Sequence, residues 1–282
     1  MLTGNRFYQW CSDWLQSERP SRRVQLSDFD QLRQELRPCD VLLVDGESRL
    51  DERIKTLSTS RWSRVLLYLG RLHDINDPAL RAIVTEYQPC ESDTQLVLEA
   101  RLDRGLILQP LTSLELGHVR ICRPRGLSHH DRQEVIRYAI SRLGLSPAPS
   151  WLDILRLLAP WGWLPRRWRL AVFSRLAGQL LRTLSGSAVG SAFAFIQYPI
   201  LPLVKRTEDG ATRLYRRHPR IFFAADFDHS PYFDIIKYPF VDHNDDHRGM
   251  RLLPWKGNHG ALSSEDEDRP PLRVVDHPTG SD

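Results

Sequence analysis

Histidine and aspartate residues gather in the stretch VDHNDDHRG, near the C-terminal end of the sequence. His243, Asp245, Asp246 and His247 carry the imidazole and carboxylate groups that bind divalent metals. Metal sites usually take their ligands from several elements of a fold, whereas these residues share one polar stretch. We therefore expect a solvated loop that follows the last strand, and no cofactor. A divalent metal site is the alternative.

The cysteines are the other residues that could act as nucleophiles or ligands. Cys11, Cys39, Cys90 and Cys122 are far apart in the chain and form no C-x-x-C pair. A zinc site or a disulfide framework is therefore not expected. We expect buried or incidental thiols.

An arginine stands at the start of an apolar run in the stretch RWSRVLLYLG. The run from Val65 to Leu69 predicts a buried strand, and Arg64 lies at its entrance. Many enzymes carry a histidine in such a place. Arginine stays protonated at neutral pH, so it cannot accept a proton.

Apolar runs and turn residues predict the elements that position these groups. Strands are expected in CDVLLVDG, RVLLYLG, QLVLEA, GLILQPL and HVRICRP, and YFDIIKYPF reads as a strand or as extended chain. Helices are expected over residues 6–17, in DFDQLRQEL, in SRLDERIKTLST with Ser48 as N-cap, in SHHDRQEVIRYAISRLG with Ser128 as N-cap, and in SGSAVGSAFAFI. His129 and His130 fall in the first turn of one of these helices, which is expected to be a surface.

Two apolar or mixed stretches after residue 185 are harder to place. The stretch AVGSAFAFIQYPILPLV predicts a core helix that runs into a buried turn, because two prolines interrupt it. RLYRRHPRIFFAADF reads as a strand or as extended chain. We expect the predicted strands to form an antiparallel set.

The overall composition is that of a soluble globular protein. The chain has 282 residues and a formal net charge of +4. That mild charge and the lack of a basic arm do not favour nucleic acid as a partner. We find no secretion signal and no apolar run long enough for a bilayer, so a cytoplasmic location is expected.

A block of tryptophan and arginine residues indicates where a membrane contact would be sought. Its members are Trp161, Trp163, Arg166, Arg167, Trp168 and Arg169. Interfacial amphipathic segments have such a composition. The alternative is ordinary packing with a basic exposed face.

Several segments together resemble a known family. They are LRPCDVLLV, TSRWSRVLLYLGRLHDINDPALR, VLEARLDRGLILQPL, LLRTLSGSAVGSAF with YPILP, and ADFDHSPYFDIIK. Their order is similar to that in the YiiX/YebB-like group of NlpC-type cysteine hydrolases, which are circularly permuted relatives of papain. The resemblance implies an α+β, permuted papain-like fold, in which an antiparallel sheet packs against helices, over residues 36–250. A helical extension would precede it at residues 1–35, and a disordered acidic tail would follow it at residues 251–282.

The resemblance also implies three site positions. The family's histidine corresponds to Arg64, its polar third residue to Glu99, and its cysteine nucleophile, at the start of a helix, to Ser185. A register shift of two residues would put Ser187 at the nucleophile position, and no cysteine lies nearby. The base and the thiol are thus both replaced, and Arg64 and Glu99 are expected to form an ion pair.

Two functions follow from these substitutions. The first is a catalytically degenerate domain that binds a lipid, acyl or peptide ligand or a partner. The second is an active hydrolase or acyltransferase, acting on amide, thioester or lipid ester bonds, with Ser185 as the nucleophile. His73, in a loop after the Arg64 strand, would be the replacement base, although a loop hydrogen bond is the simpler role for it.

Overall fold

A computed structural model describes residues 11–17, 29–102, 104–114, 118–144, 158–159, 165, 168, 172, 185–206, 211–219, 222–236, 255–256 and 261–262. The chain divides into two units, Met1–Tyr238 and Pro239–Asp282. The boundary expected at residue 250 falls within the second unit, and residues 1–35 belong to the first. In the second unit the structure describes β9 (Trp255–Lys256) and β10 (Ala261–Leu262), which pair with each other.

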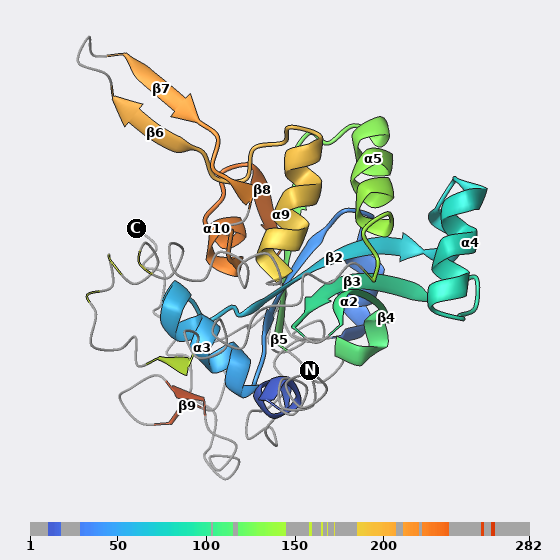
Figure 1. Ribbon diagram of the computed structural model, residues 1–282, viewed down its shortest axis with the longest axis horizontal. Coiled ribbons are helices and arrows are strands. Elements are labelled where there is room, and N and C mark those ends of the chain that lie inside the picture. Colours follow the sequence, from blue (N-terminus) through green and yellow to red (C-terminus); the bar gives the residue numbers. More distant parts are fainter. Residues whose placement is uncertain are drawn as a thin grey trace, which may run out of the picture. The chain divides into compact units, whose positions relative to one another are not determined.

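A six-stranded antiparallel sheet lies at the centre of the first unit (Figure 1). Its strand order is β4-β3-β2-β1-β5-β8. The strands are β1 (Val41–Asp45), β2 (Arg64–Arg71), β3 (Gln95–Arg101), β4 (Gly105–Pro110), β5 (His118–Pro124) and β8 (Phe233–Ile236). The first five lie where the apolar runs predict strands, and β8 lies in the stretch that reads as strand or extended chain. The α+β class with an antiparallel sheet is confirmed.

Helices surround the sheet. A helix covers residues 11–16, and the others are α2 (Phe29–Glu35), α3 (Arg49–Ser58), η1 (Leu72–Asp74), α4 (Pro78–Tyr87), η2 (Leu111–Leu114), α5 (His129–Ile140), α9 (Ser185–Phe195) and α10 (Ala224–Asp228). The two predicted N-caps hold: Ser48 accepts from the Asp51 amide, and Ser128 accepts from the Asp131 amide.

Two expectations after residue 195 are wrong in part. Leu203 and Val204 do not lie in a buried turn, because they are exposed in β6 (Leu203–Arg206), which pairs with β7 (Thr212–Tyr215). The stretch RLYRRHPRIFFAADF begins in β7, as the strand prediction requires, but its last residues form α10. The Asp226 carboxylate accepts from the Phe223 amide at 2.9 Å and stabilises the first turn of that helix.

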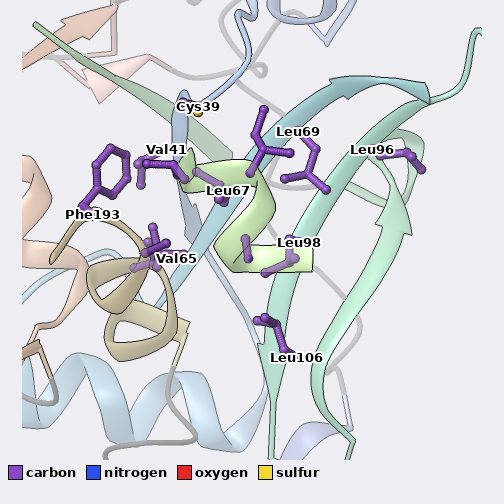
Figure 2. Packing of buried hydrophobic residues seen from close by; sticks show 14 of the residues in the cluster. Cys39, Val41, Val65, Leu67, Leu69, Leu96, Leu98, Leu106 and Phe193 are labelled. Carbon is purple, nitrogen blue, oxygen red and sulfur yellow. The ribbon is translucent and has the colours of Figure 1, made fainter. Parts of the chain in front are cut away.

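Both faces of the sheet are covered, which explains the nearly continuous apolar runs in β1 and β2. One face carries Val41, Leu43, Val65, Leu67, Leu69, Leu96 and Leu98, packed against α5 and α9 (Figure 2). The other face carries Leu42, Val44, Leu66, Tyr68, Val97 and Ile121, packed against α2. Phe193 of α9 is fully buried in the first of these two cores.

Replacing Phe193 by alanine should lower the free energy of unfolding by about 3 to 5 kcal/mol, because a large side chain leaves a cavity. Phe195 lies in the same helix but is 54% exposed, and it stacks on Tyr138 at 4.9 Å. Phe195→Ala is therefore the matched control and should lower it by only about 1 kcal/mol. Urea unfolding of both variants measures this, and equal losses would contradict the packing described.

Candidate functional site

Arg64 is the first residue of β2 and lies beside the last part of β1, opposite Val44. Glu99 lies in the neighbouring strand β3, opposite Leu66. The Arg64 Nε donates to Glu99 Oε1 at 2.6 Å. The predicted ion pair is therefore present, and the strand register explains it, because the two side chains are diagonal neighbours across β2 and β3.

The Glu99 carboxylate is almost fully buried, with 3% of its side chain exposed, and it needs donors at both oxygens. Arg64 supplies one. Gln109 of β4 supplies the other, since its Nε2 donates to Glu99 Oε2 at 2.9 Å. Glu99 is thus held between a cation and an amide on the two strands that flank it.

Sequence reasoning missed Gln109, although a signal for it exists. Glu99 lies opposite Ile107 in the β3–β4 hairpin, and Gln109 is two residues further along β4. Side chains two residues apart on a strand share a face. Gln109 is the one polar residue in the apolar run GLILQPL, and its side chain therefore points to the same face as Glu99.

The pair lies on the sheet face opposite the body of α9. Side chains alternate along a strand, so Arg64 is on the face that carries Leu66 and Tyr68. In contrast, α9 packs with Val65 and Leu67 on the other face.

The N-terminal helix of residues 11–16 lies near the same end of the sheet. Arg101, two residues after Glu99 on β3, donates from Nε to Gln16 Oε1 at 3.2 Å. Leu15 in this helix is fully buried, and Arg49 at the start of α3 donates to the Trp14 carbonyl at 3.2 Å. These contacts join the N-terminal helix to β3 and α3 of the first unit.

The third predicted position, Ser185, begins α9, as expected for a nucleophile position at a helix start. The Ser185 side chain lies outside the described part of the structure, so the described contacts bring together Arg64 and Glu99 alone. Ser187, the position given by a register shift, is 2% exposed and inaccessible to a substrate.

The start of α9 is packed closely against the segment before α10. A Cβ atom built on Gly190 would lie 2.7 Å from Cδ2 of Phe222, and one built on Gly186 would collide with the Phe222 carbonyl. Glycine is therefore required at both positions for this approach. The small residues of SGSAVGSAF serve helix packing.

His73, the candidate replacement base, lies beyond the far end of β2. Arg64 and Arg71 are the first and last residues of that strand, which puts them roughly 23 Å apart. The His73 Nδ1 lies 3.0 Å from the Ser92 carbonyl oxygen, and its Nε2 lies 3.4 Å from Asp74. His73 thus has the loop hydrogen bond expected of it and is remote from the Arg64–Glu99 pair.

The cysteines are free thiols in varied surroundings. Cys39 and Cys122 are fully buried. Burial raises the pKa of the Cys122 thiol to about 12, and it also raises the pKa of Cys39. Both thiols stay protonated at neutral pH, so neither supplies the thiolate that a cysteine hydrolase needs.

The remaining candidates lie mostly outside the described residues. His243, Asp245, Asp246 and His247 fall there, and the described part of the chain holds no group of three or more ligands that could bind a metal. His129 and His130 are exposed at the start of α5, as expected.

The tryptophan–arginine block is described only in part. Trp161, Trp163, Arg166, Arg167 and Arg169 are outside the described residues, and Trp168 is 54% exposed. None of the helices described has the length and apolar content needed to cross a membrane.

No family model matches the chain, and no curated protein matches it in sequence.

A double-mutant cycle tests the Arg64–Glu99 pair. Arg64→Met leaves a buried carboxylate without its cation, and we expect it to lower the free energy of unfolding by about 3 kcal/mol. Glu99→Gln should have a smaller effect, since Arg64 is 20% exposed and keeps contact with water. The double variant should be more stable than the sum of the single effects predicts, with a coupling of about 1 to 3 kcal/mol.

The matched control is at the other end of β2. Arg71 pairs with Asp93 at 2.9 Å, but the two side chains are 46% and 70% exposed. Arg71→Met should change the free energy of unfolding by less than about 1 kcal/mol. An equally small effect of Arg64→Met would show that the Arg64–Glu99 pair does not matter for stability.

Proposed function

We propose that the first unit is a catalytically inactive member of the permuted papain-like hydrolases, retained as a binding module. One observation carries the proposal. The position that corresponds to the family's base holds a guanidinium, which donates to the residue at the family's third position at 2.6 Å. A guanidinium has donors only and cannot take a proton from a nucleophile.

The order of the elements supports the family assignment. A helix, α3, follows the first strand, β1, and the strand with the base position, β2, comes next. The strand with the third position, β3, lies beside β2, and the helix that begins at the nucleophile position, α9, comes late. The resemblance implies the order of the last three of these elements. The Arg64–Glu99 pair and the body of α9 lie on opposite faces of the sheet, which counts against the assignment.

The surroundings of Glu99 favour a structural role over a catalytic one. Both oxygens of Glu99 already accept hydrogen bonds, from Arg64 and Gln109, and 3% of its side chain is exposed. A catalytic base needs a free oxygen within reach of its proton donor. Glu99 offers no such oxygen while Arg64 and Gln109 donate to its carboxylate.

The other side chains considered as nucleophile or base are also poorly placed for catalysis. The Cys39 and Cys122 thiols are buried and protonated, and His73 is held at the far end of β2. A serine nucleophile at position 185 needs an activating base, because a free hydroxyl is a weak nucleophile at neutral pH. These features favour a fold that lost the ancestral reaction.

Assays with peptide, thioester and lipid-ester substrates test the proposal on the full chain. We expect no turnover above that of Ser185→Ala, because the guanidinium at position 64 cannot act as the base that activates the hydroxyl. Turnover by the wild type that Ser185→Ala abolishes would establish the serine hydrolase instead. Turnover that survives this change but is lost in His73→Gln would show a site elsewhere in the chain.

A further inference from the structure

A pocket lies at the C-terminal end of α9, next to the root of the ribbon that β6 and β7 form. Two parts of the chain line it: residues 194–202, which include the end of α9, and Arg216, Arg217 and Phe222, which follow β7. Its volume is about 60 Å³, whereas one water molecule needs roughly 10 to 15 Å³. The pocket therefore has room for a chain of a few carbon atoms.

Most of the pocket wall is carbon. Tyr198 adds its ring to this surface, because its hydroxyl is occupied in a hydrogen bond to the Tyr232 carbonyl at 2.7 Å. The other apolar members of the lining are Ala194, Pro199, Ile200, Leu201, Pro202 and Phe222. Concave apolar surfaces with a few polar groups are the usual binding sites for small molecules.

The contacts behind the wall hold it in place. The Ile200 carbonyl accepts a hydrogen bond from the buried Ser230 hydroxyl. Phe222 packs so closely on α9 that a Cβ atom built on Gly190 would lie 2.7 Å from its Cδ2. A wall that is already fixed lowers the ordering cost that binding has to overcome.

Two cations supply the charge of the lining, and none of the described residues that line the pocket is acidic. Arg216 is exposed, and its Nη2 donates to the Gln197 side-chain oxygen at 3.0 Å, which orients it beside the pocket. The acidic residues Glu208 and Asp209 belong to the connection at the opposite end of the ribbon. By the strand register, that connection begins about 10 Å beyond the pair Leu203–Tyr215.

Arg217 has a hydrogen-bond donor that its described partners do not satisfy. Its side chain is 12% exposed, and its Nη1 donates to Asp226. Its Cζ lies 5.4 Å from the centroid of the Phe222 ring. The Arg217 Nε is buried and meets no acceptor in the described part of the chain, which costs free energy. An anionic oxygen in the pocket would favour a turn of the guanidinium that gives Nε an acceptor.

We propose that this pocket binds a carboxylate carried on a short aliphatic chain. The carboxylate contacts Arg216 and the guanidinium of Arg217, which turns towards it, and the chain packs against Phe222 and the apolar wall. A free monocarboxylic acid and the C-terminal residue of a peptide both offer this chemistry. The length of α9, about 15 Å, separates the pocket from Ser185. The site therefore does not depend on the function proposed above.

A carboxylate suits this pocket better than phosphate does. Phosphate carries more than one negative charge at neutral pH and has no carbon, so an apolar wall removes its water without replacing it. An aliphatic carboxylate carries a single charge, and its chain gains from burial.

Titration of pentanoate into the full chain, followed by nitrogen–proton correlation spectra, tests the proposal. The Nε–H signal of Arg217 should shift in a saturable way, because it gains an acceptor. Pentanamide has the same chain without the charge and should bind at least about tenfold more weakly. Acetate lacks the chain and should also bind at least about tenfold more weakly.

The same titration with N-acetylleucine distinguishes the two sources of the carboxylate. Tighter binding of N-acetylleucine than of pentanoate would identify the C-terminal residue of a peptide as the ligand. Tighter binding of pentanoate would identify a free acid.

Variants separate the two parts of the site. Arg216→Ser removes a cation, and Ala194→Leu fills the pocket without changing its charge, and each should weaken the binding of pentanoate by about tenfold. Arg213→Ser is the matched control, because Arg213 is an exposed arginine of β7 outside the lining, and it should bind as the wild type does. Thermal unfolding shows whether each variant is folded, and Arg216→Ser changes an exposed side chain.

Several results would overturn the proposal. They are the absence of a saturable shift with pentanoate, equal binding of pentanoate and pentanamide, and unchanged binding by a folded Ala194→Leu variant. Inorganic phosphate that binds more tightly than pentanoate, with the same dependence on Arg216, would also overturn it.

Discussion

A carboxylate buried between strands must be matched by donors, and Glu99 sets this condition for one end of the sheet. Its side chain is 3% exposed, and it accepts from Arg64 on one side and from Gln109 on the other. An unpaired charge in this place would be strongly destabilising. The registers of β2, β3 and β4 therefore have to bring these side chains to the same face, since a shift by one residue would turn each of them to the other face.

This condition links the fold to the loss of chemistry that we propose. An imidazole at position 64 could exchange a proton and would be neutral much of the time at neutral pH. A guanidinium stays charged and satisfies Glu99 permanently, which favours stability over reactivity. The close approach of α9 to Phe222 fits the same view, because Gly186 and Gly190 are needed for packing at the helix start.

Local signals in the sequence predict much of this structure. The apolar runs with Asp45-Gly46 and other turn residues identify the sheet strands, and Ser48 and Ser128 identify two helix starts. The Arg64–Glu99 pair could be predicted only through the family resemblance, because the two residues are distant in the chain. The contact of Gln16 with Arg101 depends on tertiary packing, which no local pattern encodes. The role of Gln109 follows from its place in an apolar run once the register of the β3–β4 hairpin is known.

The errors have a physical cause as well. Leu203 and Val204 follow an apolar, proline-containing stretch, and their hydrophobicity predicts burial. They are exposed because β6 pairs only with β7, outside the main sheet. Hydrophobic residues on a surface are hard to distinguish by composition from those in a core.

The most direct test of the account is the state of the Arg64 side chain in solution. A nitrogen–proton correlation spectrum resolves arginine Nε–H groups, and that of Arg64 should show slow exchange with water because it donates to a buried carboxylate. Glu99→Gln should shift this signal and speed its exchange, whereas Asp93→Asn, at the exposed pair with Arg71, should leave it unchanged. Fast exchange of the Arg64 Nε–H in the wild type, at the rate of an exposed arginine, would contradict the account.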